Sequence, residues 1–405
     1  MPETLRTRTV VSRSEDPAAL QTALRHAGAL CESPTVSDTP NAAAAEYVRG
    51  VVGNLGKVEV TTYEDPRGVT KTNLVAAFGP AADASSGGPS GHGLALAAHT
   101  DVVPAVDWHD ATPGPFVPTV VGDRLYARGA CDMKGPLAAM LAAIERTDLS
   151  TLTGPLYLVA TADEEVGFVG ARQLMQTDGL YRRLVEDRVP MLVGEPTELA
   201  VVHAHKGSCL ITATARGVAG HSSGTAGRNA NWAMIPFLAE MAEIRTETER
   251  DARWHDDRFA PPTLGLNVTV NDGNRAINVT SDRSVCHIYV RPMPTVPVGP
   301  LVDRLTDAAG RHGLEISVER AGEAVYVEPD SPFVTLVGEV AGTAPPRTVS
   351  YGTDAAAFVA DIPEVVVCGP GSIEQAHTRD EFITLGQLSA GVAFFGRLID
   401  RCCRQ

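Results

Sequence analysis

The sequence predicts an α/β protein in which a smaller domain interrupts a larger one. Three observations predict this fold. In the first half of the chain, short apolar runs typical of buried strands alternate with helical segments. Between residues 207 and 320 the predicted elements follow the order βαββαβ, and after that the first pattern returns. We therefore expect a discontinuous mixed-sheet domain of residues 1–206 and 321–405, with residues 207–320 as an inserted domain.

Length and composition limit the classes of function. A chain of 405 residues exceeds what one core usually fills, so two domains are expected. The net charge of −15, without a basic cluster, argues against nucleic acid and is compatible with a cationic substrate. No apolar run is long enough to span a membrane, and residues 1–8 lack the apolar core of a secretory signal. Seven cysteines without CxxC spacing favour a reducing cytoplasm over a disulfide framework.

The larger domain is predicted from apolar periodicity and from turn residues. Its expected helices are 17–33, a segment from an N-cap at Thr39-Pro40 to about 55, 136–144, 330–340 and 385–401. Its expected strands are 57–63, 72–78, 94–98, 156–161, 191–194 and 364–368. A Gly/Ser-rich stretch over 80–93 is expected to be a surface loop.

The inserted domain is predicted in the same way. We expect strands over 209–216, 263–270, 284–291 and 314–319, and helices over 229–250 and 301–312. This is the split βαβ order of a ferredoxin-like domain.

The strand 94–98 ends in a histidine and an aspartate two positions apart. His99 lies where the strand stops, at the carboxyl edge where open α/β sheets carry their chemistry. Residues two apart in a strand point the same way, so Asp101 could hold one ring nitrogen of His99 and leave the other for a metal.

Similar groups follow the later strands and turns. The acidic and imidazole side chains at these ends are His99, Asp132, Glu164, Glu165, Glu195 and His377. Two imidazoles with several carboxylates, and no thiolate, suit zinc, manganese or cobalt. One carboxylate more than a single four-coordinate ion needs suggests two ions that share a carboxylate.

These segments resemble metallopeptidase family 20, the di-zinc peptidases and N-acyl-amino-acid deacylases. The matching segments lie in family order along nearly the whole chain: Ala98–Pro104, Ala127–Gly135, Thr161–Glu165, Gly194–Thr197, Gly220–Ser223 and Gln375–His377. Within the family the chain is most similar to the acetylornithine deacetylases, through Ala204–Gly207, Arg291–Pro294, Thr353–Ala355 and Gly369–His377.

The resemblance implies two divalent metal ions, zinc with cobalt as an alternative. Asp132 would bridge them, His99 and Glu195 would complete one site, and Glu165 and His377 the other. Glu164 would be the general base, Asp101 would orient His99, and the peptide bond after Asp132 would be cis.

The resemblance also assigns a role to the inserted domain as a lid and dimerisation domain. His221 would donate a hydrogen bond to the oxyanion in the active site of the partner subunit of a homodimer. Asn278 and Arg291 match lid positions that contact substrate, and Arg291 would pair with a substrate carboxylate.

The expected reaction is hydrolysis of the acyl–nitrogen bond of an N-acyl amino acid, giving ornithine and acetate from N-acetylornithine. Thr378-Arg379 stands where many acetylornithine deacetylases carry a proline, which leaves two alternatives within the family. The substrate could be another N-acyl amino acid, such as N-succinyl-diaminopimelate or an intermediate of specialised metabolism, or a dipeptide. An inactive metal-binding interaction protein is a third possibility, but the intact Glu164 argues against it.

Two features are interpreted as carrying no chemistry. Gly220–Gly224 matches the GxSxG elbow of serine hydrolases, and Ser222, Asp354 and His377 follow in the matching order. The elbow requires a strand directly before it and a helix directly after it, and the sequence predicts neither. Cys131 is interpreted as a packing residue and not as a metal ligand.

Overall fold

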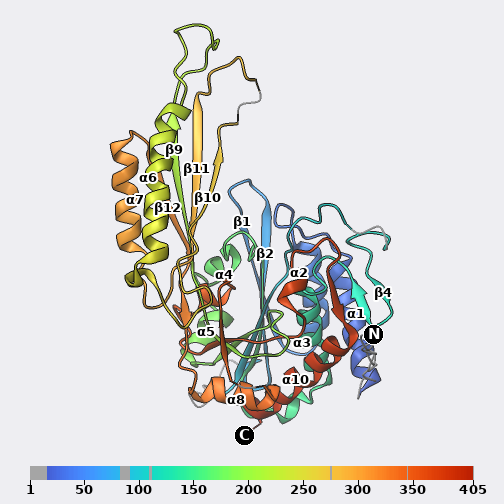
Figure 1. Cartoon of the computed structure of the whole chain (residues 1–405). Helices are drawn as coiled ribbons and strands as arrows, with labels where there is room; N and C mark the ends of the chain where they lie inside the picture. Colours follow the sequence, from blue (N-terminus) through green and yellow to red (C-terminus); the bar gives the residue numbers. More distant parts are fainter. Residues whose placement is uncertain (1–15, 83–91, 109–111, 274–275, 344, 405) are drawn as a thin grey trace, which may run out of the picture. The chain divides into compact units, whose positions relative to one another are not determined.

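The computed structural model describes residues 16–82, 92–108, 112–273, 276–343 and 345–404 (Figure 1). The chain forms two compact units. The first comprises Met1–Val201, Pro329–Pro346 and Asp361–Gln405, and the second Val202–Glu328 and Arg347–Ala360. The second unit therefore extends beyond the expected insert of 207–320 at both ends and takes in a later segment. The predicted absence of a secretory signal concerns residues that lie outside the described ones.

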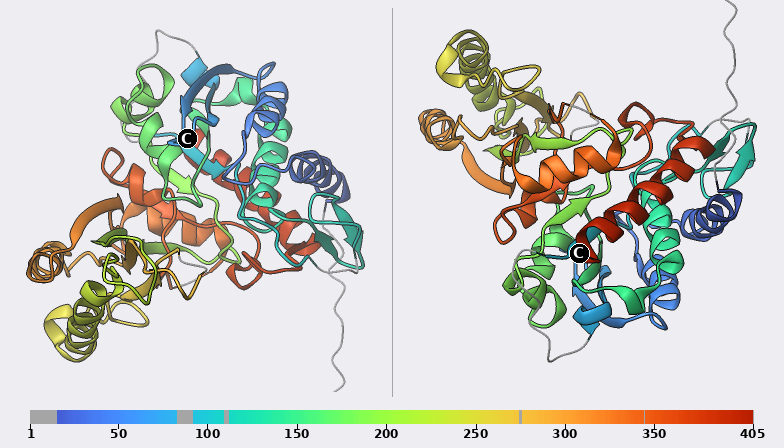
Figure 2. Two further views of the ribbon diagram at one scale, coloured as in Figure 1. Left: turned by 90° about the horizontal axis from the view of Figure 1, so that it is seen from above. Right: turned by 90° about the horizontal axis from the view of Figure 1, so that it is seen from below.

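The first unit contains a mixed sheet with helices on both faces. Its helices are α1 (Pro17–Cys31), α2 (Ala42–Val52), α3 (Lys134–Arg146), α4 (Val169–Leu174), α5 (Leu180–Glu186), α8 (Pro332–Ala341) and α10 (Leu385–Cys403). Its strands are β1 (Lys57–Glu64), β2 (Thr70–Phe78), β3 (Leu94–His99), β4 (Thr119–Val121), β5 (Arg124–Tyr126), β6 (Leu156–Thr161), β7 (Met191–Val193), β15 (Val365–Val367) and β16 (Phe382–Thr384). Figure 2 shows α4 and α5 on one face of the sheet and α1, α2, α3 and α10 on the other.

The strands that the first unit contributes to this sheet follow the order β1-β2-β6-β3-β7-β15. The hairpin β1-β2 is antiparallel and pairs antiparallel with β6, whereas β6, β3, β7 and β15 run parallel to one another. Every residue of β3, β6, β7 and β15 is buried, as the unbroken apolar runs of these strands require. Because the four strands are parallel, their carboxyl ends lie at one edge, and this edge carries the site described below.

The second unit contains the expected βαββαβ arrangement. Its main elements are β9 (Ser208–Arg216), α6 (Asn231–Arg250), β10 (Asn267–Asn271), β11 (Arg283–Val290), α7 (Gly299–Arg311) and β12 (Glu315–Gly322). The antiparallel sheet has the order β10-β11-β9-β12, which is the ferredoxin-like order, and α6 and α7 lie on the same side of it (Figure 1). Smaller elements are β8 (Val202–His205), β13 (Val325–Tyr326), β14 (Arg347–Val349) and α9 (Ala355–Phe358).

The α/β fold class and the mixed sheet are confirmed, but two element boundaries were predicted wrongly. Helix α2 begins at Ala42, because the hydroxyl of Thr39 donates to the carbonyl of Val36 and caps no helix. The strand expected over 263–270 begins only at Asn267. Most of the loop predicted over 80–93 lies outside the described residues. Within the described residues, no helix is both long and apolar enough to cross a membrane.

Candidate metal centre

Six side chains predicted from the sequence meet at the carboxyl edge of the parallel strands. β3 ends at His99, β6 is followed by Glu164 and Glu165, and β7 by Glu195. The other two come from loops: Asp132 precedes α3, and His377 follows a short 3₁₀ turn, Ile373–Gln375, at a positive φ of 62°.

The six side chains form overlapping groups with metal-ligand spacing. Three groups have ligand atoms within 4.8 Å of one another: His99–Asp132–Glu195, Asp132–Glu165–His377 and His99–Glu164–Glu165. The two carboxylate oxygens of Asp132 face different histidines. Oδ1 lies 3.1 Å from Nε2 of His99, and Oδ2 lies 3.4 Å from Nε2 of His377. This places Asp132 between the two groups, as a shared carboxylate requires.

His99 is held in one tautomer by the main chain. Its Nδ1 lies 3.0 Å from the carbonyl oxygen of Asp101, which can only accept, so Nδ1 carries a proton and Nε2 is the ring nitrogen that loses its proton when the ring is neutral. The Asp101 carboxylate is farther from Nδ1, at 3.6 Å. Its oxygens instead accept from the backbone N–H groups of Glu164 and Glu165 at 3.1 and 3.4 Å. Asp101 therefore connects the end of β3 to the turn after β6.

Glu381 is a buried residue of this centre that the sequence analysis did not identify. Its carboxylate accepts from Nη1 of Arg128 at 2.6 Å and from the backbone N–H groups of Gly129, Cys131 and Asp132 at 3.0, 2.8 and 2.9 Å. These contacts fix the loop that carries Asp132, whose peptide bond to Met133 is cis as predicted. The available signal was the Asp380-Glu381 pair shortly after His377.

Cys131 lies in the same loop but points away from the ligand groups. It is buried, its Sγ donates to the carbonyl of Ser372 at 3.2 Å, and it belongs to none of the three groups. Burial raises the pKa of its thiol well above the usual value, so the side chain stays a neutral packing residue.

The charges of the centre favour cations. Hydrogen bonds with Asp132 and Glu165 raise the pKa of His377 to about 10. Burial opposes protonation of His99, but the neighbouring carboxylates outweigh it and raise the His99 pKa well above its usual value. Burial and the charge of Asp132 raise the pKa of Glu165. Four carboxylates thus face two imidazoles, and the excess negative charge with mixed nitrogen and oxygen donors fits divalent zinc, cobalt or manganese.

The second unit carries His221 and Asn278 next to each other. The backbone N–H of Ser222 donates to the carbonyl of Asn278 at 2.9 Å, and both His221 and Asn278 are exposed. Nδ1 of His221 accepts from the backbone N–H of Ser223 at 3.2 Å. A neutral His221 therefore carries its proton on Nε2, the form that donates a hydrogen bond outward.

Arg291 lies at the opposite end of β11. It directly follows that strand, its backbone N–H donates to the carbonyl of Leu264 at 2.7 Å, and its guanidinium stacks on Tyr289 at 4.7 Å. Asn278 precedes the same strand. Eight residues of strand separate the two ends by roughly 25 Å. The structure therefore brings His221 and Asn278 together within one chain, but not Arg291 with either of them.

The GxSxG match is not a nucleophile elbow. β9 ends at Arg216 and α6 begins only at Asn231, so Ser222 lies in a long connection between them. The strand and helix that sharpen such a turn are not adjacent to it.

The fold and the metal centre together define a metal-dependent hydrolase. Comparison with known proteins names the family. Residues 95–401 match the family described as Peptidase family M20/M25/M40. The chain is 33% identical over 394 residues to an acetylornithine deacetylase of Yersinia pestis, covering 93% of this chain and 96% of that protein. It is 34% identical over 380 residues to an acetylornithine deacetylase of Myxococcus xanthus, covering 91% and 94%. The chain belongs to this peptidase family.

Solved structures share the fold at low sequence identity. The di-peptidase Dug1p of Saccharomyces cerevisiae matches with a TM-score of 0.70 at 14% identity, covering 94% of this chain and 97% of that one. The M20 family metallo-carboxypeptidase Sso-CP2 of Sulfolobus solfataricus matches with a TM-score of 0.67 at 18% identity, covering 95% and 99%. The predicted family and the predicted class of metal-dependent hydrolase are thus confirmed.

Proposed function

We propose that this protein is a di-metal amidohydrolase that removes the acyl group from an N-acyl amino acid, with N-acetylornithine as its substrate and ornithine and acetate as products. The observation that carries the proposal is the pair of histidine–carboxylate groups that share Asp132, with Glu164 beside them. The substrate is supported by the names of relatives that match over more than nine tenths of the chain. The negative net charge is compatible with a cationic amino acid.

Five residues are proposed to hold two ions, Zn²⁺ or alternatively Co²⁺. His99 and Glu195 would serve one ion, Glu165 and His377 the other, and Asp132 both. Bound divalent ions supply Lewis-acid chemistry: they lower the pKa of water and polarise a carbonyl oxygen. The contact of His99 Nδ1 with the Asp101 carbonyl favours this arrangement, because it leaves Nε2, which faces Asp132, as the ring nitrogen that can bind an ion.

Glu164 is proposed as the general base. Its carboxylate lies within the group formed with His99 and Glu165 and is largely buried, so it can take a proton from the attacking water and pass it to the leaving amine. Asp101 is proposed to position both the ligand His99 and the base Glu164. Its carbonyl fixes His99, and its carboxylate fixes the backbone of Glu164 and Glu165.

The second unit is proposed as the lid and dimerisation domain of a cytoplasmic homodimer. His221 would donate Nε2–H to the oxyanion, Asn278 would contact the substrate, and Arg291 would pair with its carboxylate. Because Arg291 lies at the far end of β11 from the other two, one site that uses all three would take them from two subunits. Exposed apolar side chains on α6, Trp232 at 74% and Ile235 at 52%, support a protein contact on this unit.

A substrate panel with metal analysis tests the proposal. The purified protein is assayed against N-acetylornithine, other N-acetyl amino acids, N-succinyl-diaminopimelate and dipeptides, before and after removal of metal by a chelator and re-addition of Zn²⁺ or Co²⁺. We expect acetate release from N-acetylornithine that the chelator abolishes and metal restores. Turnover of other compounds only would overturn the substrate and keep the chemistry. Two bound ions without any turnover would identify a metal-binding interaction protein instead.

A further inference from the structure

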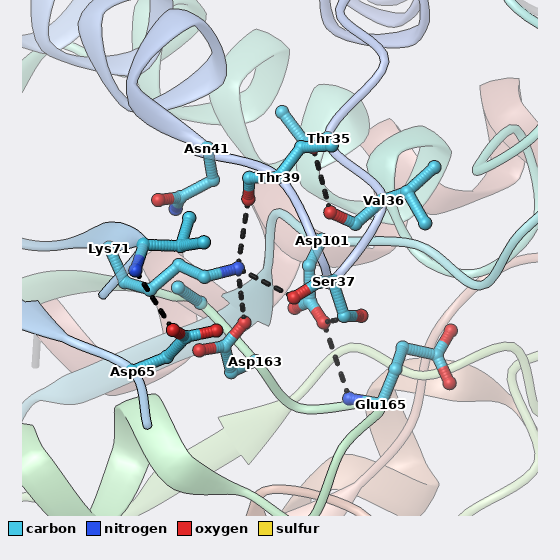
Figure 3. A network of polar contacts seen from close by, with 12 residues as sticks. Thr35, Val36, Ser37, Thr39, Asn41, Asp65, Lys71, Asp101, Asp163 and Glu165 are labelled. Carbon is cyan, nitrogen blue, oxygen red and sulfur yellow. Dashed lines mark hydrogen bonds and ion pairs between the residues drawn. The ribbon is translucent and has the colours of Figure 1, made fainter. Parts of the chain in front are cut away.

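Lys71 is a fully buried lysine whose ammonium group is surrounded by three oxygen atoms. Nζ donates to the carbonyl oxygens of Ser37 and Thr39 at 2.7 and 2.8 Å and pairs with Oδ1 of Asp163 at 2.7 Å. The exposed fraction of its side chain is zero. Two of the three hydrogen atoms of the ammonium group are donated to these carbonyls, and the Asp163 carboxylate lies within ion-pair distance. Figure 3 shows the Lys71 side chain between the Ser37–Thr39 segment and Asp163.

Asp163 begins the turn that carries both Glu164 and Glu165. It adopts a positive φ of 54°, an uncommon conformation for a residue other than glycine, so the turn depends on outside contacts to keep its shape. Its second carboxylate oxygen accepts from the hydroxyl of Tyr63 at 2.9 Å. Lys71 and Tyr63 thus anchor the first residue of the turn from the hairpin β1-β2.

The opposite side of the same turn is connected back to Lys71 through Asp101 and Ser37. Asp101 accepts from the backbone N–H groups of Glu164 and Glu165, and its Oδ2 also accepts from the hydroxyl of Ser37 at 2.7 Å (Figure 3). The carbonyl of Ser37 is one of the three partners of Lys71. The contacts therefore form a closed ring from Lys71 to Asp163, along the turn to Asp101, and through Ser37 to Lys71.

A second side chain of β2 supports the same loop. Asn73 lies two residues after Lys71 and so points to the same side of the strand. Its Nδ2 donates to the carbonyl of Gly170 at 2.8 Å, and its Oδ1 accepts from the backbone N–H of Ala162 at 3.0 Å. Strand β2 thus holds the loop after β6 at Ala162, Asp163 and Gly170, although none of its own residues is among the ligand groups.

We propose that Lys71 is a positioning residue of the metal centre, acting through Asp163 and the ring closed by Ser37 and Asp101. The inference rests on the proposed pair of metal sites. The ring fixes the backbone of Glu165. Its loss should therefore weaken the binding of the ion held by Glu165 and His377 more than the binding of the ion held by His99 and Glu195. The ring also fixes the backbone of Glu164, so the same loss should lower kcat with little change in KM.

The test measures zinc affinity without substrate, by competition with a chromophoric chelator. In Lys71→Met we expect the second equivalent of Zn²⁺ to bind about 10- to 100-fold more weakly, the usual effect of removing a group that orients a metal ligand. The matched control is Lys206→Met. Lys206 is a buried lysine of the second unit whose Nζ donates to the carbonyls of Pro261 and Thr263 at 2.7 and 2.5 Å. It should lower Tm and leave both zinc affinities unchanged.

The double variant Lys71→Met/Asp163→Asn separates positioning from simple charge burial. Removing both charges leaves no uncompensated carboxylate, so Tm should recover in part. The second zinc affinity should stay low, because the neutral pair no longer anchors the turn. Recovery of that affinity in the double variant, or wild-type affinity in Lys71→Met, would overturn the inference.

Ser37→Ala keeps the inference testable if Lys71→Met does not fold. It removes only the hydroxyl that donates to Asp101 and should weaken the second Zn²⁺ several-fold. An unchanged affinity in this variant would also overturn the inference. Wild-type protein that binds fewer than two equivalents of zinc would contradict the proposed function itself, and with it the inference. If the wild-type protein binds two equivalents of zinc but turns over no acyl amino acid, the zinc affinities of the variants still test the inference.

Discussion

Glu164 and Glu165 are adjacent in the sequence, yet of the two only Glu165 belongs to the ligand group of Asp132 and His377. Glu165 contacts His377 at 3.0 Å and is shared with the group around Asp132, whereas Glu164 appears only in the group with His99 and Glu165. This difference favours Glu164 as the base. We expect Glu164→Gln to keep two bound metal ions and to lower kcat by about 10²- to 10⁴-fold, because the amide cannot accept the proton. Metal analysis and steady-state kinetics measure both; an active variant would exclude Glu164 as the base.

His205 gives the second unit a pH-dependent stability. Burial lowers its pKa to about 4, and its neutral form is held by Nδ1 donating to the carbonyl of Lys206 at 2.8 Å and by a contact of Nε2 with the Thr353 hydroxyl at 3.1 Å. In the unfolded chain the pKa is about 6.5, so below that pH the unfolded state binds the proton first and stability falls as pH falls towards 4.

The size of this effect can be isolated with His205→Gln. A difference of about 2.5 pKa units corresponds to on the order of 3 kcal/mol. We therefore expect the free energy of unfolding of the wild type to drop between pH 7 and pH 4 by about that much more than in the variant, measured by urea denaturation. Parallel pH profiles for the two proteins would contradict the assignment.

At the scale of elements, the loop that carries Asp132 is held in place from β16, the strand that follows His377 in the sequence. Glu381 immediately precedes β16, which pairs with β5, and this small sheet places its carboxylate against four donors of the 128–132 loop. Glu381→Gln leaves the buried Arg128 without its carboxylate, which costs about 3–5 kcal/mol in comparable pairs. We expect a lower Tm together with weaker binding of both metal ions.

The control for this prediction is Glu374→Gln, which removes an exposed carboxylate three residues before the proposed ligand His377 in the sequence. Exposed substitutions of this kind usually change stability by less than about 0.5 kcal/mol. Tm from thermal denaturation and metal affinity by chelator competition should therefore match the wild type. Equal behaviour of the two variants would show that the Glu381 contacts do not fix the loop.

The elements that could be predicted from the sequence are those with an unbroken apolar run or a clear alternation of apolar and polar residues. β3, β6 and α3 have unbroken buried runs, and the βαββαβ order of the second unit was readable from alternating segments. The sheet β16-β5-β4 was not predicted, because its short strands are mostly exposed or half-buried and lack the unbroken apolar runs by which the equally short β7 and β15 were recognised. The same reason limits the site. His99 ends a recognisable strand and Glu195 follows one, whereas Lys71 and Glu381 act through contacts with segments far away in the sequence; the Asp380-Glu381 pair marks the position of Glu381 but not these contacts.

At the scale of the whole molecule, the two ends of β11 raise the question of how many chains build one active site. His221 and Asn278 lie near its beginning, and Arg291 follows its last residue. The length of the strand separates the two ends by roughly 25 Å, more than a small amino-acid substrate can span. A site that uses both ends therefore needs two copies of the second unit, and the exposed Trp232 and Ile235 on α6 offer an apolar surface for such a contact.

Subunit complementation tests this arrangement directly. Glu164→Gln and His221→Ala should each be nearly inactive, the second by about 10²-fold or more if it removes an oxyanion donor. In a hybrid dimer one site combines an intact Glu164 from one chain with an intact His221 from the other. Random exchange of a 1:1 mixture makes half of the dimers hybrids with one intact site each, so about a quarter of the wild-type activity should return. Mixing two Glu164→Gln preparations is the control. If activity stays at the level of the separate variants although subunits exchange, each chain completes its own site and His221 serves no partner.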